Sequence, residues 1–384
     1  MISAYIHIPF CEQLCYYCDF NKVFLQNQPV DHYLTSLEHE MELMKQRTGE
    51  SELKTVYIGG GTPTALTPMQ LDQLCQSVQR HFTIAPNAEW TVEANPGDLT
   101  AEKLNILRQY GVNRISMGVQ SFDDALLKKI GRNHTAKEVY STMRQIEKSG
   151  FENVTIDLMY ALPGQSYEQW MDSVQQALSL GLPHLSMYSL ILENQTVFAN
   201  LARQGKLILP SDEEEVRMFE SAKFQLAEQG LNQYEISNFS KPGFESQHNL
   251  MYWNNEHYFG FGAGASGYLG SWRYRNKGPI QHYMADVDHD RLPMIETGKL
   301  AVHNQMEEHL FLGLRKMAGV TNESFRQHFG CSLWEVYGEV IDQLVSQELL
   351  IKEAEGIRLT EKGLLFGNDV FAAFLMDDET EEAK

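Results

Sequence analysis

Short apolar runs alternate with amphipathic stretches over about the first 190 residues. The runs are rich in Val, Ile and Tyr and most are bounded by Gly or Pro, which is typical of buried strands. Between the runs, apolar side chains recur at helical spacing, as Leu71, Leu74, Cys75 and Val78 do. The pattern predicts six strands, at Ala4–Ile8, Thr55–Ile58, Trp90–Ala94, Arg114–Val119, Val154–Tyr160 and Leu185–Leu190.

Strands and helices that alternate along a chain predict an α/β fold, with a parallel sheet and right-handed crossovers. Thr100 and Thr135 each precede charged residues that suit a first helical turn, so helices are expected to begin there. An open doubly wound sheet and a full or partial β/α barrel of about six parallel strands both satisfy the pattern. In both architectures the ligand site lies at the carboxyl ends of the strands.

The pattern loosens from about Glu193 to Ile295, where Asn, Gly and aromatic residues are frequent. From about Leu300 it becomes helical again. Helices followed by a hairpin predict a small winged-helix-like α+β domain over 300–376, ahead of an acidic tail at 377–384. The expected elements are helices at Met306–Met317 and Leu333–Leu344, a hairpin turning at Glu355-Gly356, and a closing helix at Glu361–Leu375.

The charge balance argues against nucleic acid as a partner. Lys and Arg number 31 against 51 Asp and Glu, a net charge of −20, and phosphate backbones are bound by cationic surfaces. Residues 301–384 alone carry 7 basic against 16 acidic residues, so the winged-helix-like domain is expected to dock protein rather than DNA. No apolar run approaches about 18 residues, and no export signal is visible, which predicts a cytoplasmic protein without a spanning helix.

Three of the five cysteines, Cys11, Cys15 and Cys18, lie within eight residues of one another. In a reducing compartment such a group more often holds metal than forms disulfides. A [4Fe–4S] cluster needs four ligands, and the next plausible donor position holds Phe20, so one iron is expected to be open to an external ligand. A structural zinc site is the alternative, although zinc usually takes four ligands and the sequence offers no second Cys/His pair nearby.

The cysteine motif CEQLCYYC resembles that of the radical S-adenosylmethionine (SAM) superfamily, in which the open iron chelates the amino acid end of SAM. The resemblance covers about residues 4–280 and points to the coproporphyrinogen-dehydrogenase-like branch, and within it to the HemW family of heme chaperones. It implies a radical SAM β/α barrel over 1–290, with a heme-chaperone motif region at about 240–280. The motifs that carry it, in order, are YIHIPFC, GGGTP, VEANP, RISMGVQSF, GRNH, IDLMYALPGQ and HNLMYW.

The same resemblance implies a SAM site, and each residue type suits its role. Glycine lets the backbone approach a ligand closely, a carboxylate pairs with an ammonium, and arginine binds a carboxylate with two donors. Polar side chains inside apolar strands need partners, which the adenosine and ribose of SAM would supply. The implied residues are Gly60, Gly61 and Thr62 at the SAM ammonium, Glu93 at the ammonium or ribose, Arg132 at the carboxylate, Gln120 and Asp157 at the adenosyl and ribose groups, and Tyr5 and Tyr17 in the pocket wall.

For heme, the resemblance points to His248 in HNLMYW as the ligand of the iron, with Tyr252 and Trp253 able to stack on the porphyrin. Neutral imidazole is a common axial ligand of heme iron. A second glycine motif, GAGASG at Gly262–Gly267, matches GxGxxG but lacks a strand–turn–helix setting and a following acid. It is interpreted as a segment whose backbone packs near the pocket.

The sequence thus predicts a protein that binds a [4Fe–4S] cluster, SAM and heme, and passes heme to acceptor proteins. A low-potential electron donor is an expected partner, and contact with a membrane surface is compatible with the prediction. The alternative is an oxygen-independent coproporphyrinogen III dehydrogenase, whose motif has a fourth cysteine where Phe20 stands. That branch also carries a longer segment before the cluster, whereas ten residues precede Cys11, so no catalytic residue is assigned.

Overall fold

A computed structural model describes residues 1–376, except for the side chains of residues 296 and 297. The predicted acidic tail at 377–384 lies outside the described residues. The main domain is built on one sheet of twelve strands. These strands are β1 (Ile2–Ile8), β4 (Glu52–Gly60), β5 (Thr83–Ala94), β6 (Arg114–Gln120), β7 (Asn153–Tyr160), β8 (His184–Ser189), β9 (Asn232–Gln233), β10 (Asn238–Ser240), β11 (Tyr258–Phe261), β12 (Ser266–Leu269), β13 (Trp272–Asn276) and β14 (Met294–Lys299).

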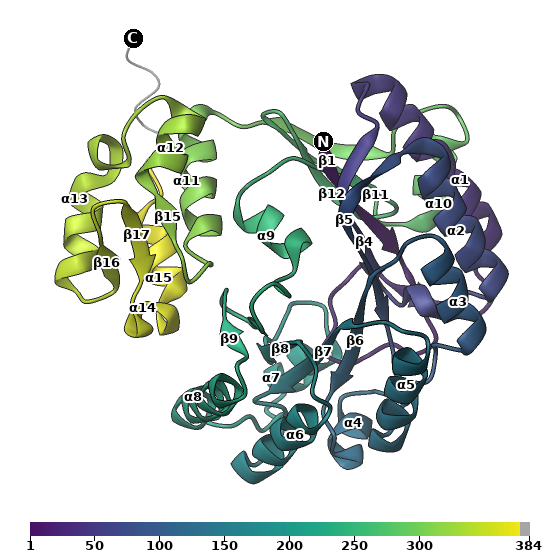
Figure 1. Ribbon diagram of the computed structural model, residues 1–384, viewed down its shortest axis with the longest axis horizontal. Coiled ribbons are helices and arrows are strands. Elements are labelled where there is room, and N and C mark those ends of the chain that lie inside the picture. The colour runs from purple at the N-terminus through teal and green to yellow at the C-terminus, as the bar shows by residue number, and fades with distance from the viewer. Residues whose placement is uncertain (377–384) are drawn as a thin grey trace.

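The strand order is β14-β13-β12-β11-β1-β4-β5-β6-β7-β8-β10-β9. Neighbours from β11 through β8 pair in parallel, and the outer strands pair antiparallel. The order has two free ends, so the sheet curls into a partial barrel and does not close (Figure 1). The predicted α/β fold with a partial parallel barrel is therefore confirmed.

Helices that follow the parallel strands cover the outer face of the sheet (Figure 1). Their starts are encoded locally: Thr67, Thr135 and Ser166 each accept a hydrogen bond from the backbone three residues on, in reciprocal capping boxes. The helices of the main domain are α1 (Val30–Thr48), α2 (Pro68–His81), α3 (Ala101–Gln109), α4 (Asp124–Lys129), α5 (Ala136–Lys148), α6 (Tyr167–Ser179), α7 (Val197–Arg203), α8 (Asp212–Glu228), α9 (Gln247–Trp253) and α10 (Ile280–Val287), with a 3-10 turn at Pro63–Ala65.

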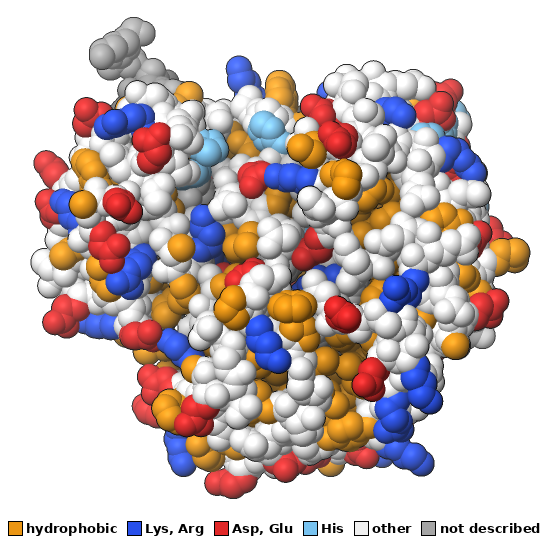
Figure 2. Space-filling view, viewed as in Figure 1, with side chains coloured by type: hydrophobic (Ala, Val, Ile, Leu, Met, Phe, Trp, Pro, Cys, Tyr) orange, Lys and Arg blue, Asp and Glu red, His pale blue; other side chains and the backbone are white. Residues whose placement is uncertain are grey.

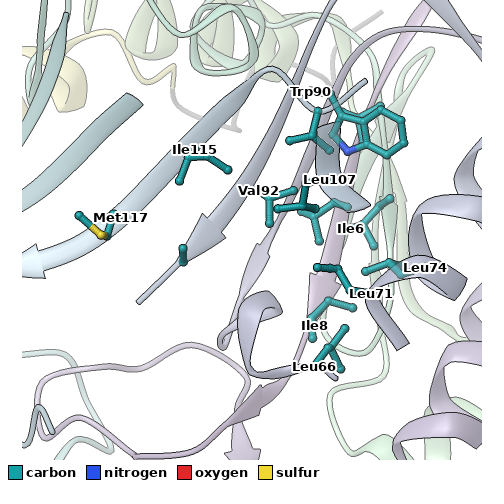
Figure 3. Packing of buried hydrophobic residues seen from close by; sticks show 14 of the residues in the cluster. Ile6, Ile8, Leu66, Leu71, Leu74, Trp90, Val92, Leu107, Ile115 and Met117 are labelled. Carbon is teal, nitrogen blue, oxygen red and sulfur yellow. The ribbon is translucent and has the colours of Figure 1, made fainter. Parts of the chain in front are cut away.

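The core lies between the sheet and these helices. Ile6 of β1 and Val92 of β5 are buried; Ile6 lies beside Leu74 of α2, and Val92 lies beside Leu107 of α3 (Figure 3). Burying each such side chain stabilises the fold by about 1.5–3 kcal/mol. Because side chains alternate along a strand, the residues between them, such as Tyr5 and Glu93, face the barrel interior. When the apolar residues of a strand face the helices, the polar residues between them therefore point into the barrel.

The stretch from 193 to 295, where the sequence pattern loosens, nevertheless forms regular helices and strands. This stretch holds α7 to α10 and β9 to β13, and β11 extends the parallel sheet beyond the six predicted strands. The run Tyr258–Phe261 is short and contains Gly260, so its strand character depends on pairing with β1 rather than on local propensity. Strand β14 pairs with β13, which extends the main sheet to Lys299.

The C-terminal domain has its own core around Phe325, Tyr337 and Ile341. The expected closing helix is wrong in one respect: it breaks at Phe366, whose φ of −109° and ψ of 29° are not helical. The first helix also begins earlier than expected. The elements are α11 (Val302–Gly313), α12 (Asn322–Phe329), β15 (Val320–Thr321), α13 (Leu333–Ser346), β16 (Leu350–Lys352), β17 (Gly356–Leu359), α14 (Glu361–Leu365) and α15 (Gly367–Ala373).

Helix α9 lies between the barrel and the C-terminal domain (Figure 1). The guanidinium of Arg315 lies 5.2 Å from the ring centre of Trp253 and 5.4 Å from that of Phe371. The backbone of Ile236 and Met317 adds two hydrogen bonds across the same junction. Acidic and basic side chains are interspersed over the viewed face (Figure 2). In residues 1–376 no helix combines the length and the apolar character needed to cross a membrane.

Candidate functional site

A cavity of about 310 Å³ opens at the carboxyl ends of the parallel strands. One wall is the cysteine loop, which runs between the short strands β2 (Phe10–Cys11) and β3 (Val23–Phe24). The predicted site residues that line this cavity are Cys11, Cys15, Cys18, Tyr17, Gly60, Gly61, Thr62, Glu93, Gln120, Arg132 and Asp157. Tyr5 and His248 are the predicted residues that it does not include.

The three thiols line the same cavity. Thr62 Oγ1 donates to Cys11 Sγ at 3.7 Å, and Arg132 Nη1 donates to Cys15 Sγ at 3.7 Å. Burial raises the pKa of the Cys11 thiol to about 11, and burial also raises the pKa of Cys18. A metal group bound here would replace these thiol protons, as thiolate ligation requires.

The donors that the cysteine loop offers are thiols. Within residues 1–376 no three His, Cys, Asp or Glu side chains are gathered closely enough to hold one metal ion. Three thiols around one cavity match three corners of a [4Fe–4S] cluster. Phe20 lines the cavity and supplies no donor atom, so the site offers three cysteine ligands.

The glycine turn after β4 is shaped by packing. Gly60 has a φ of +111°, and a Cβ there would lie 2.4 Å from the imidazole of His7. The N–H groups of Gly60, Gly61 and Thr62 donate to Glu93 Oε2, Ile8 O and Phe10 O at 3.0, 2.8 and 2.8 Å. Since these three donors are used inside the protein, the turn suits a ligand that itself donates, such as an ammonium.

Two carboxyl groups reach the cavity from neighbouring parts of the sheet. Tyr57 OH donates to Glu93 Oε1 at 2.7 Å. Burial raises the pKa of Glu93 to about 6, although the bonds from Tyr57 and Gly60 oppose the shift. Burial likewise raises the pKa of Asp157 to about 6, against the effect of Ser186 and the two arginines nearby. A cationic ligand would favour the charged form of both groups.

The positive charges of two arginines lie near these carboxyl groups. Arg132 Nη1 donates to Asn95 Oδ1 at 3.0 Å and Nη2 donates to Gly118 O, while its buried Nε has no hydrogen-bond partner in the described structure. Arg114, at the start of β6, is 2% exposed and lines the same cavity, and its Nε pairs with the carboxylate of Glu89 at 3.9 Å. A buried donor without a partner is rare, so Arg132 is suited to meet a ligand.

Sequence reasoning missed Arg114, Asn95 and Asn249, which also line the cavity. Arg114 could have been noticed in the sequence because it is a charged residue at the start of the apolar run RISMGV. Gln120, which was predicted, has a φ of +68° at the end of β6. A non-glycine residue in the left-handed region at a strand end is typical of a binding site.

His248 has a different environment from the one expected. It is 1% exposed, Nδ1 hydrogen-bonds to Thr55 Oγ1 at 2.7 Å, and Nε2 hydrogen-bonds to Tyr252 OH at 3.0 Å. Its ring stacks on Tyr57 with centres 5.1 Å apart. Burial lowers its pKa to about 3, so the imidazole is neutral. Both ring nitrogens are engaged, so ligation of heme iron by His248 stays a prediction that requires the bond to Tyr252 to break.

The other residues of the HNLMYW motif contact three different parts of the protein. Asn249 lines the cluster-side cavity, whereas Tyr252 lines a second cavity of about 340 Å³ together with Tyr5. Trp253 meets Arg315 of the C-terminal domain. Glu89 fixes the start of this helix by accepting from the N–H of His248 at 2.9 Å. Helix α9 therefore joins both cavities to the C-terminal domain.

The GAGASG segment packs by its backbone, as expected. Gly262 N donates to Glu40 Oε2 at 2.8 Å, and Ala263 N donates to Tyr33 OH at 2.9 Å. Asn21 Nδ2, at the end of the cysteine loop, donates to Ala263 O at 2.8 Å. Glu40 is fully buried, and burial raises its pKa to about 7. The segment thus ties the cysteine loop to α1.

Comparison with known proteins identifies the fold and the family. A family model described as the Radical SAM superfamily matches residues 5–177, and one described as the HemN C-terminal domain matches residues 300–366. The solved structure of coproporphyrinogen III oxidase (HemN) from Escherichia coli superimposes with a TM-score of 0.85 over 97% of this chain and 89% of that chain. The two are 24% identical, so that likeness concerns the fold.

Curated relatives give the family. The chain is 49% identical to the heme chaperone HemW of Lactococcus lactis, over 98% of both chains. It is also 49% identical to the heme chaperone HemW of Bacillus subtilis, over 98% of this chain and 99% of that one. The heme chaperone HemW of Escherichia coli is 33% identical over 98% of both. The chain therefore belongs to the HemW family of heme chaperones, within the radical SAM superfamily.

Proposed function

We propose that this protein is a heme chaperone that binds a [4Fe–4S] cluster, SAM and heme, and transfers heme to acceptor proteins. One observation carries the proposal: three thiols, two buried carboxyl groups and two buried arginines converge on a single cavity that offers no fourth cysteine. Cys11, Cys15 and Cys18 would hold three irons. When bound, a reduced cluster of this kind supplies an electron to the sulfonium of SAM.

The residues around the cavity suit the separate groups of SAM. Glu93 and the glycine turn would accept from the ammonium, and Arg132 would pair with the carboxylate through two donors. Asp157 and Gln120 lie on β7 and at the end of β6, where they suit the ribose and adenine. Tyr17 lies in the cluster-side cavity, while Tyr5 contributes from the second cavity.

Heme binding is supported by the names of the relatives and by the aromatic second cavity. Heme-acceptor proteins and a low-potential electron donor are the proposed partners. We place the protein in the cytoplasm, where reducing conditions keep cluster thiols free. All five cysteines are unpaired in the structure.

The test is anaerobic reconstitution followed by separate titrations with SAM and hemin. The proposal expects about four irons and four sulfides per chain, SAM binding that depends on the cluster, and one heme per chain that moves to an apoprotein acceptor. Zinc at one equivalent without a cluster signal would contradict it. Conversion of coproporphyrinogen III to a vinyl product at catalytic turnover would favour the dehydrogenase instead.

A further inference from the structure

The second cavity adjoins the first and shares one side chain with it. Phe20 lines both cavities, and it is 60% exposed although it is a large apolar residue. The other side of the second cavity carries Tyr5, Tyr252 and Tyr258. An exposed arginine, Arg275, also lines it. The cavity thus combines several aromatic faces with one cationic side chain and one carboxylate, that of Asp19.

We propose that the second cavity seats the porphyrin plane of heme, with Phe20 as a stacking platform between the porphyrin and the cluster side. This inference rests on the proposed heme-binding function and assigns it a place. A porphyrin is a wide aromatic plane, and aromatic rings prefer offset or edge contacts with such a plane. Its carboxylates suit a guanidinium, which binds them with two parallel donors.

The aromatic wall is continuous with the cluster-side cavity. Tyr5 and Tyr57 stack with ring centres 6.2 Å apart, and Tyr57 and His248 follow at 5.1 Å. His248 then meets Tyr252 at 4.9 Å, and Tyr252 meets Tyr258 at 4.7 Å. In this arrangement His248 supports Tyr252 by an edge-to-face ring contact and by a hydrogen bond. It acts as a positioning residue for the wall.

Seating by stacking does not depend on the iron, which separates this inference from axial ligation by His248. Metal-free protoporphyrin IX should therefore bind the same place. The cluster-loaded, full-length protein is titrated with hemin by absorbance and with protoporphyrin IX by fluorescence quenching. Variants are Phe20→Ala and Arg275→Gln, and Phe224→Ala on α8 is the matched control because Phe224 is 65% exposed and lines neither cavity.

Phe20→Ala is expected to weaken both hemin and protoporphyrin IX about 5- to 10-fold, since one aromatic contact is lost. Arg275→Gln is expected to weaken them about 2- to 5-fold, and to have no effect on protoporphyrin IX dimethyl ester, which lacks the carboxylates. Phe224→Ala should match the wild type. Iron and sulfide contents must equal those of the wild type in each variant, because Phe20 belongs to the cysteine loop.

The outcomes distinguish a failure of the proposed porphyrin seat from a failure of the proposed heme-binding function. If the wild type binds neither hemin nor protoporphyrin IX at one site per chain, the proposed heme function fails. If the wild type binds them and both Phe20→Ala and Arg275→Gln bind equally well, the function stands and the second cavity is not the seat. If hemin binds but protoporphyrin IX does not, ligation of iron dominates and the stacking platform is refuted.

Discussion

The affinity for SAM should fall as the pH falls through about 6, and Glu93 should be the main cause. Burial raises the pKa of Glu93 to about 6, against the bonds from Tyr57 and Gly60; Asp157 raises it further and Arg114 lowers it. A group whose pKa is near 6 is mostly ionised at pH 7.5 and mostly neutral at pH 5.5. Only the ionised form attracts the SAM ammonium, so acid removes the binding-competent state.

The magnitude follows from the ionised fraction. With a pKa of about 6, that fraction is about 0.97 at pH 7.5 and about 0.24 at pH 5.5, and the apparent dissociation constant scales with its inverse. One carboxyl therefore predicts about a fourfold loss of affinity over this range, and about sixteenfold if Asp157 must ionise as well. Glu93→Gln should weaken SAM binding at pH 7.5 about tenfold or more, because hydrogen bonds to charged groups contribute about 1.5–3 kcal/mol.

The assay is isothermal titration of cluster-loaded protein with SAM from pH 5.5 to 8.0, with iron and sulfide measured at each pH. Asp98→Asn is the matched control, because burial raises the pKa of Asp98 to about 6 as well, yet Asp98 does not line the cavity. Its pH profile should equal that of the wild type. A wild-type affinity that changes less than twofold, or an unchanged slope in Glu93→Gln, would refute the reasoning.

Three further changes test other parts of the structure. Replacing Cys11, Cys15 or Cys18 with Ser should abolish the cluster, and a variant with full iron and sulfide content would remove that residue from the ligand set. Glu40→Ala should lower the free energy of unfolding by about 3–5 kcal/mol, because three buried donors lose their acceptor, and urea denaturation measures it. His248→Ala should lower the free energy of unfolding by about 2 kcal/mol or more through lost buried hydrogen bonds, and should weaken heme binding or shift the heme absorption band; an unchanged affinity and band would remove His248 from the heme ligands.

Local patterns predicted most of the barrel because its strands are apolar on the helix side and its helices are capped within the sequence. For example, Thr135 and Glu138, which lie within four residues of each other, form the capping box that begins α5. β11 escaped prediction because it gains its strand character from β1, far away in the chain. Likewise, the environment of His248 depends on Thr55 and Tyr57, which lie nearly two hundred residues earlier.

The site likewise combines features that local sequence encodes with features that depend on the fold. The cysteine spacing marks the cluster ligands without any fold, whereas Arg114 becomes a site residue only when β6 is aligned beside β5 and β7. The sequence identified Phe20 only as the residue that stands where a fourth ligand would be expected. Its position between two cavities depends on how the loop folds over the barrel, which no local pattern encodes.

The placement of α9 has a consequence for any partner that binds the C-terminal domain. One short helix contacts the barrel through His248 and the C-terminal domain through Trp253. If a partner displaces α9 when it binds the C-terminal domain, the walls of both cavities change with it. By thermodynamic linkage, a ligand in either cavity would then change the affinity for that partner by the same factor.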